Sequence, residues 1–163
     1  MRRKSMNEMK LIFPSDSRNE SYARYAVTAF VAQLDPTTEE LADIRTAVSE
    51  AVTNSIVHAY NGGKTEGKIW IECRAEEDAT GGVLHITIKD DGCGIADVEK
   101  ALQPFFTTLE NEERSGMGFT IMQSFMDGFS LCSEKGKGTT VSMFRTITGE
   151  ALTPQTEKER MDA

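Results

Sequence analysis

The stretch Thr46–Asn61, TAVSEAVTNSIVHAYN, decides the fold of this chain. It contains neither Pro nor Gly and is rich in apolar residues, which predicts a helix. Its one charged residue is Glu50, and Asn54 follows four positions later, on the same helix face. A solvated helix face carries several charges, whereas this face places one carboxylate and one amide among small side chains. The pattern therefore suits the wall of a cavity.

This pair of side chains has a chemical interpretation and a structural one. A carboxylate can accept a proton, and an amide oxygen can ligate a hard cation such as Mg²⁺. On this helix alone, Glu50 and Asn54 are equally consistent with a buried hydrogen-bonded pair that carries no chemistry. The glycine-rich segments further along the chain decide between the two.

Composition limits the classes of protein that the chain can represent. Its 163 residues suit one domain, and 18 basic against 26 acidic residues give a net charge of −8, which disfavours direct binding to nucleic acid. Three separated cysteines without a CxxC pattern argue against a disulfide framework or a zinc site. No apolar run is long enough to span a bilayer, and no signal-peptide core follows the basic N-terminus. We therefore expect a cytoplasmic protein without a membrane partner.

The remaining periodicities predict an α+β fold, a two-layer sandwich with helices on one face of a mostly antiparallel sheet. We expect one domain over residues 1–147 and a disordered tail over 148–163. Thr37 or Thr38 would cap the central helix, with Glu39 or Glu40 near its positive end. The other predicted helices are 22–34, a short one at 97–102, and 118–126, and the predicted strands are 9–13, 68–76, 83–89, 129–133 and 139–146.

Three glycine clusters follow the central helix. The first, Asp90-Asp91-Gly92-Cys93-Gly94, comes directly after a predicted strand, where the Asp90 carboxylate is placed to accept a hydrogen bond from an exocyclic amine such as that of adenine. Glycines there permit a tight turn and a close approach of backbone to ligand. An ordinary strand-to-helix turn explains this cluster equally well when it is taken alone.

The second cluster, Arg114-Ser115-Gly116-Met117-Gly118, leads into a predicted helix, whose free N–H groups make a phosphate site. Arg114 would add positive charge, and the loop Gln103–Ser115 would close over the phosphates. The third cluster, Gly136-Lys137-Gly138-Thr139-Thr140, leads into the last strand, where a threonine hydroxyl can bond to a base. Each cluster is weak evidence alone, because glycine patterns have many false positives.

The order of the motifs is more specific than any one of them. ExxxN on a helix, DxGxG after a strand, GxG before a helix and GxGTT before a strand resemble the N box and glycine boxes of the gyrase, MutL and histidine-kinase ATPase superfamily, whose ATP-binding domain is the Bergerat fold. The resemblance covers about Phe13 to Phe144. Within the superfamily, the segments VSEAVTNSIVHAY, KDDGCGI, PFFTT and ERSGMGFTIMQSFMD are similar to the small serine-kinase anti-sigma factors of spore-forming bacteria.

This resemblance implies an activity and a role for each motif. Glu50 would be the general base that activates an acceptor serine, and Asn54 would ligate the Mg²⁺ that bridges the phosphates of ATP. Asp90 would recognise adenine, with Thr139 nearby and Thr140 left open as an alternative. The pocket and its lid would be shaped by glycines at four positions, namely Gly92, Gly94, Gly116 and Gly118.

The same resemblance implies the partners. The protein would sequester a sporulation sigma factor of the sigma F type while an adenine nucleotide, ATP or ADP, is bound. It would phosphorylate an anti-anti-sigma factor on serine, and the unphosphorylated form of that factor would displace the sigma factor. A homodimer is also implied, with the partners competing for overlapping surface. We expect Glu20 and Arg24, on the outward side of the first helix, to contribute to that surface.

Other classes fit the sequence less well. Sensor histidine kinases carry a phosphoacceptor histidine on a preceding helical hairpin, whereas His58 and His85 lie inside the central helix and a predicted strand. Gyrase and MutL relatives need a transducer domain, for which the segment after Arg145 is too short, so we expect a stand-alone module. The alternative function is a nucleotide-gated sigma-factor-binding protein without significant kinase activity. The presence of Glu50 favours the kinase, since pure binding needs no base.

Overall fold

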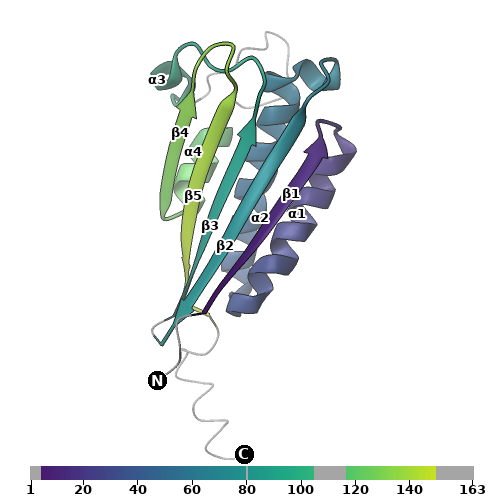
Figure 1. Cartoon of the computed structure of the whole chain (residues 1–163). Helices are drawn as coiled ribbons and strands as arrows, with labels where there is room; N and C mark the ends of the chain where they lie inside the picture. Colours follow the sequence, from purple (N-terminus) through teal and green to yellow (C-terminus); the bar gives the residue numbers. More distant parts are fainter. Residues whose placement is uncertain (1–4, 80, 105–116, 150–163) are drawn as a thin grey trace, which may run out of the picture.

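The computed structural model describes residues 5–79, 81–104 and 117–149, which form one α+β unit. A single sheet is covered on one face by α1, α2 and α4, while α3 lies beyond one end of the strands (Figure 1). The predicted fold class is confirmed. The helices are α1 Arg18–Val31, α2 Thr38–Asn54, α3 Val98–Ala101 and α4 Gly118–Phe125, and the strands are β1 Ser5–Pro14, β2 Lys68–Asp78, β3 Gly81–Asp90, β4 Gly128–Ser133 and β5 Thr139–Ile147.

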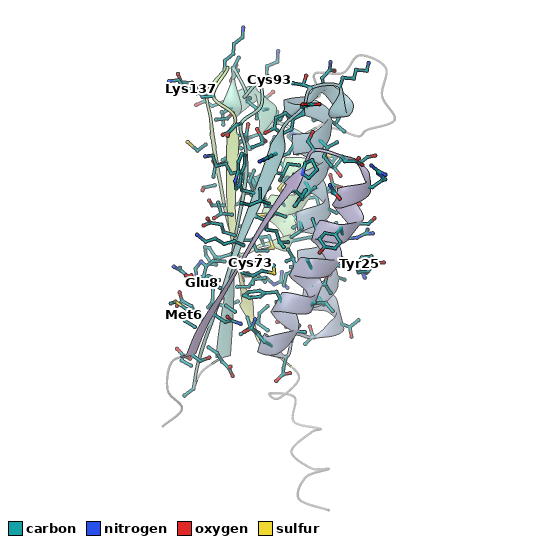
Figure 2. All side chains as sticks on the ribbon, turned by 45° about the vertical axis from the view of Figure 1, so that its right-hand side comes forward. Met6, Glu8, Tyr25, Cys73, Cys93 and Lys137 are labelled. Atoms are coloured by element: carbon teal, nitrogen blue, oxygen red, sulfur yellow. The ribbon has the colours of Figure 1, made fainter. Side chains whose placement is uncertain are left out.

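The described strands form a five-stranded sheet in the order β1-β2-β3-β5-β4, and each neighbouring pair is antiparallel. Along β2, Ile69, Ile71 and Cys73 are buried, whereas the alternate residues Glu72 and Arg74 are exposed. This period of two gives the sheet one apolar face and one charged face. Figure 2 shows Cys73 between sheet and helices, with Met6 and Glu8 on the side away from the helices.

The two long helices cover the apolar face because each has one apolar stripe. In α1, the buried residues Ala23, Val27 and Val31 recur every fourth position. The sequence interpretation of this helix, an apolar stripe through Tyr22, Ala26, Ala29, Phe30 and Leu34, is wrong at Tyr22 and Ala29, which are exposed. In α2, Ile44, Val48 and Val52 recur in the same way and are fully buried. One side of α2 therefore packs on the sheet, and the side that carries Glu50 and Asn54 does not take part in this packing.

The N-terminus of α2 is fixed by a buried carboxylate. Thr37 Oγ1 accepts the Glu40 N–H at 3.1 Å, and Glu40 Oε2 accepts the Thr37 N–H at 2.9 Å, which is a capping box. Glu40 Oε1 also accepts from the backbone N–H and the hydroxyl of Thr148, at 2.7 and 2.6 Å. The chain after β5 is thus held to the start of α2 at Thr148, one residue beyond the predicted end of the domain. Residues 150–163, which make up the rest of the predicted tail, lie outside the described residues.

Two helix ends differ from the prediction. The first helix begins at Arg18, four residues earlier than predicted, and its last turn, Ala32–Leu34, is a 3₁₀ helix. The central helix becomes a π-helix over Ser55–Ala59. Within the described part of the chain, no helix is both long and apolar enough to cross a membrane.

Glu40→Gln is expected to lower the free energy of unfolding by about 1–3 kcal/mol at neutral pH, because it weakens several hydrogen bonds to a buried carboxylate. Burial by itself would raise the pKa of Glu40, but its bonds to Thr148, Thr37 and Gly149 lower it overall. A lowered pKa gives stability that is present above the unfolded-state pKa and is lost as pH falls through the folded-state value. Urea unfolding of wild type and variant at neutral and acidic pH measures this difference.

The difference between wild type and Glu40→Gln should shrink as pH falls. The exposed neighbour Glu39 provides the matched control, since Glu39→Gln changes charge in the same helical turn. Equal effects of the two substitutions would show that Glu40 acts only through the helix dipole.

Candidate functional site

A cavity of about 800 Å³ opens beside α2, where the sequence motifs meet. Its lining comes from α2 and the π-helix, from the loop after β3, from the start of α4 and from the start of β5. Cys93, which also lines it, lies at the upper end of the molecule in Figure 2. The predicted site residues on this lining are Glu50, Asn54, Asp90, Gly94, Gly118 and Thr139.

Glu50 and Asn54 lie half-buried on the cavity side of α2 and face the start of α4. A Cβ atom on Gly118 would stand 3.1 Å from Glu50 Oε2 and 3.1 Å from Asn54 Nδ2. The predicted helix pair and the second glycine cluster are therefore in contact. A side chain at this position would be tight against both groups, so glycine allows the first turn of α4 to approach the carboxylate and the amide without displacing them.

The helix that carries this pair widens immediately after Asn54. The Tyr60 N–H donates to the Ser55 carbonyl at 3.2 Å, a bond to the fifth residue back, which is the π pattern. Two carbonyls of the π-helix bond to the first glycine cluster. The Cys93 N–H donates to the Ala59 carbonyl at 3.1 Å, and the Cys93 thiol donates to the His58 carbonyl at 3.2 Å. The π-helix thus joins the loop after β3 to the helix of Glu50.

Asp90 is a buried carboxylate at the inner end of the cavity, with only 3% of its surface exposed. Its Oδ1 accepts the N–H groups of Gly92 at 3.0 Å and Thr139 at 3.2 Å, and its Oδ2 accepts the Ser55 hydroxyl at 2.9 Å. Burial raises the pKa of Asp90, and these three bonds act in the opposite direction. The carboxylate is held in one orientation and keeps lone pairs for a ligand.

The third glycine cluster packs against the first. Gly94 has a φ of +69°, and a Cβ there would lie 2.0 Å from the Glu134 carbonyl oxygen. The Gly136 N–H also donates to the Cys93 carbonyl at 2.6 Å. Of the two threonines that follow, Thr139 lines the cavity, and Thr140 lies next along the strand, where side chains alternate between the two faces. The choice between them favours Thr139.

The sequence analysis missed three residues that support the site: Ser55, which lines the cavity, and Tyr60 and Ser133, which lie behind its lining. The Tyr60 hydroxyl accepts the Asp91 N–H at 2.8 Å and donates to the Lys68 carbonyl at 2.6 Å. None of the three stands in a glycine motif, and a serine or tyrosine inside a helix or strand gives no signal of its partner. Arg114, Gly116 and most of the predicted lid, residues 105–115, lie outside the described residues.

The oxygens present at the site fit the predicted Mg²⁺ ion. Asn54 lines the cavity and offers an amide oxygen, which is a hard ligand, while the neighbouring carboxylate of Glu50 stays available as a base. Among the described residues no group of three or more His, Cys, Asp or Glu side chains could hold a metal ion. Mg²⁺ usually binds through one or two protein oxygens together with waters and substrate phosphates, and the amide oxygen of Asn54 is a ligand of this kind.

The predicted partner residues are less exposed than expected. Side chains of Glu20 and Arg24 are only 20% and 30% exposed, and Ser49 Oγ of α2 donates to Glu20 Oε1 at 2.5 Å. They therefore lie at the edge of the contact between α1 and α2, and not on the fully outward side of α1. That side carries Tyr22 and Tyr25, which are 64% and 62% exposed, with Tyr25 projecting outward in Figure 2.

Comparison with known proteins identifies relatives over most of the chain. Residues 13–145 match the family model described as the histidine kinase-like ATPase domain. The anti-sigma F factor of Geobacillus sp. (strain WCH70) is 56% identical over 142 residues, which cover 87% of this chain and 94% of that protein. The anti-sigma F factor of Bacillus subtilis (strain 168) is 50% identical over 141 residues, which cover 86% of this chain and 93% of that protein.

A solved structure agrees on the fold. The RsbU and RsbW domains of Rv1364c from Mycobacterium tuberculosis superpose with a TM-score of 0.59 at 16% identity, covering 90% of this chain and 35% of that one. At this identity the likeness concerns the fold alone.

Gly118→Ala tests whether the contact between α4 and α2 matters for nucleotide binding. The new methyl group would crowd Glu50 and Asn54, so affinity for Mg-ATP should fall by about tenfold or more, while the fold keeps its stability because Ala favours a helix over Gly by up to ~1 kcal/mol. Nucleotide titration and thermal unfolding measure the two effects. Gln123→Ala, an exposed position of α4, is the control. Undiminished affinity in Gly118→Ala would contradict this geometry.

Proposed function

Because the chain belongs to the anti-sigma F factors, within the histidine kinase-like ATPase family, we propose that it is an anti-sigma factor that is also a serine protein kinase. It sequesters a sporulation sigma factor of the sigma F type while holding ATP or ADP. It transfers the γ-phosphoryl group of ATP to a serine of an anti-anti-sigma factor.

One observation carries the kinase proposal. Glu50 and Asn54 share the cavity face of α2 and meet Gly118 at the start of α4, while Asp90 lies at the inner end of the same cavity. A site for adenine, a site for phosphates and a carboxylate base are thereby available within one space. A protein that only bound a nucleotide would need the first two but not the base.

The phosphates of the nucleotide would lie between α2 and α4. Free N–H groups at the start of α4 suit an anion, and Arg114 would add positive charge there. Asn54 would hold Mg²⁺ together with the phosphates, and the ion would neutralise charge on the transferred group. Glu50 would accept the proton of the attacking serine hydroxyl.

The base of the nucleotide would lie at the other end of the cavity. Asp90 would accept a hydrogen bond from the exocyclic amine of adenine, and Thr139 would contact the same edge. The loop Gly92–Gly94 would approach the base closely, since its backbone is packed on the π-helix and on the hairpin before β5.

Glu50→Gln and Asn54→Ala should fail in different ways. Glu50→Gln keeps the shape but removes the basic carboxylate, so serine phosphorylation should fall by roughly 10²–10⁴-fold while Mg-ATP binding is retained. Asn54→Ala removes a metal ligand and should weaken the Mg²⁺-dependent part of nucleotide affinity. The measurements are single-turnover transfer of radiolabelled phosphate to the acceptor and nucleotide titration with and without Mg²⁺.

The same experiment separates the kinase from the alternative. Near wild-type transfer by Glu50→Gln would make Glu50 a structural acid. Absence of transfer by the wild-type protein, with sigma-factor binding intact, would favour a nucleotide-gated binding protein without significant kinase activity.

Arg24→Ala tests the proposed partner surface at the edge of α1 and α2. Its guanidinium is 4.0 Å from Glu20 and partly exposed, which leaves it available for an acidic group of a sigma factor or an anti-anti-sigma factor. We expect partner affinity to fall by about tenfold or more, as for an arginine anchor, while ATP affinity stays near wild type. Calorimetric titration with each partner measures this effect, and Arg18→Ala, at an exposed position on the same helix, is the control. Unchanged affinity for both partners would remove Arg24 from the surface.

A further inference from the structure

We propose that Ser133 sets the nucleobase preference of the cavity by holding the Thr139 hydroxyl as a hydrogen-bond acceptor. Thr139 and Asp90 would then select a base that presents an exocyclic amine over one that presents a carbonyl at the same position. The inference rests on the proposed function in one respect, since it takes a purine nucleotide as the ligand of this cavity.

Ser133 is the last residue of β4, and its hydroxyl lies within hydrogen-bonding distance of three groups. Its Oγ accepts the Ile95 N–H at 2.8 Å, and it lies 2.9 Å from the Gly138 carbonyl oxygen and 2.8 Å from Thr139 Oγ1. A hydroxyl has one hydrogen to donate and two lone pairs that accept. The carbonyl of Gly138 can only accept, so it takes the hydrogen of Ser133. Thr139 must then donate its own hydrogen to the remaining lone pair of Ser133.

The reverse arrangement satisfies fewer groups. If Ser133 donated to Thr139, the Gly138 carbonyl would lose this donor, and Gly138 is buried. A buried carbonyl left without a partner costs on the order of 1–3 kcal/mol. The Thr139 hydrogen would also become free to turn toward the cavity and serve a carbonyl oxygen. The arrangement with Ser133 donating to Gly138 therefore determines what Thr139 can offer.

With its hydrogen engaged, Thr139 presents only lone pairs to the cavity that it lines. Its backbone N–H donates to Asp90 Oδ1 at 3.2 Å, which holds the carboxylate beside it. An ionised carboxylate also only accepts. Two neighbouring acceptors suit the amine of adenine, whereas the carbonyl oxygen of hypoxanthine or guanine would meet lone pairs alone. A site built in this way rejects the wrong base through unpaired buried polar groups.

Ser133 acts through Thr139 and is a positioning residue, so its test must measure preference as well as affinity. ATP and inosine triphosphate differ in having an amine or a carbonyl at this position of the purine, and the adjacent ring nitrogen is an acceptor in ATP and a donor in inosine triphosphate. Both are titrated against the full chain as wild type and as Ser133→Ala. We expect wild type to prefer ATP, and the ratio of the two dissociation constants to fall by roughly 3–10-fold in Ser133→Ala, because the Thr139 hydroxyl can then turn.

Three further variants sharpen the test. Ser133→Thr keeps a hydroxyl and should restore most of the preference. In a Thr139→Val background, Ser133→Ala should change the ratio no further, since the two residues act as one unit. Ser130→Ala, at an exposed position on the same strand, is the matched control and should leave the ratio unchanged.

The outcomes separate this inference from the proposed function. A wild-type protein that prefers ATP, together with an unchanged ratio in Ser133→Ala, overturns the role of Ser133 and leaves the proposed function standing. Equal loss of both nucleotides in Ser133→Ala shows a merely structural role and also overturns it. A wild-type protein without preference overturns the adenine assignment as well. If Ser133→Ala does not fold, Thr139→Val carries the test, and an unchanged ratio in that variant overturns the inference.

Discussion

The buried carboxylate of Asp90 is the interaction on which the architecture of the cavity depends. Its three hydrogen bonds reach Ser55 in the π-helix, Gly92 in the loop after β3 and Thr139 at the start of β5. These segments are far apart in the sequence, and the bonds to Asp90 add to the pairing of β3 with β5 and to the bonds from Cys93 to the π-helix. Because a buried charge is costly unless it is fully bonded, the carboxylate forces all three segments to take one arrangement. The inner end of the cavity is therefore formed by the fold before any ligand arrives.

The other end of the cavity depends on α2 in a different way. One side of α2 is apolar and fixed by the sheet, and its N-terminus is fixed by the capping box of Glu40. The position of Glu50 and Asn54 then follows from helical geometry alone. Gly118 lets α4 approach this pair. Catalysis that depends mostly on positioning needs its reacting groups on a rigid element. Here α2 would provide that element, and the glycine at the start of α4 lets backbone approach it.

Much of this arrangement could be predicted from the sequence because it follows from local patterns. The fourfold spacing in α2 gives its buried stripe, and the alternation in β2 and β3 gives the sheet. The glycine motifs point to the cavity because glycine marks close backbone approach. The π-helix at Ser55–Ala59 could not be predicted, since no Pro or Gly marks it and its cause is tertiary. Its carbonyls bond to Cys93, which is more than 30 positions away.

The hydrogen-bond partners of individual hydroxyl and carboxylate groups could not be predicted from the sequence either, because these bonds are also set by tertiary structure. Ser133 and Thr139 face each other across the β4–β5 hairpin, but the direction of their hydrogen bond depends on Gly138 and Ile95. Nothing local pairs Glu20 with Ser49, and this bond holds Glu20 away from the outward side of α1. Amphipathic patterning classifies Glu20 as solvent-facing because it is charged, but an acid at a helix–helix edge can bond to a hydroxyl of the neighbouring helix. For polar residues at such edges, helical periodicity alone predicts the wrong side-chain orientation.

Glu40 and Asp90, the buried acids among the described residues, have pKa values shifted in opposite directions, so acidification affects the site and the fold at different pH. Burial alone would raise the pKa of Glu40, but its hydrogen bonds lower it overall, so its contribution to stability is lost only as pH falls through this lowered pKa. Burial raises the pKa of Asp90, so Asp90 takes up a proton at higher pH, and the folded state favours that proton. A protonated Asp90 is no longer an acceptor-only group beside Thr139. Acidification should therefore change the nucleobase end of the cavity while the contact that fixes α2 is still intact.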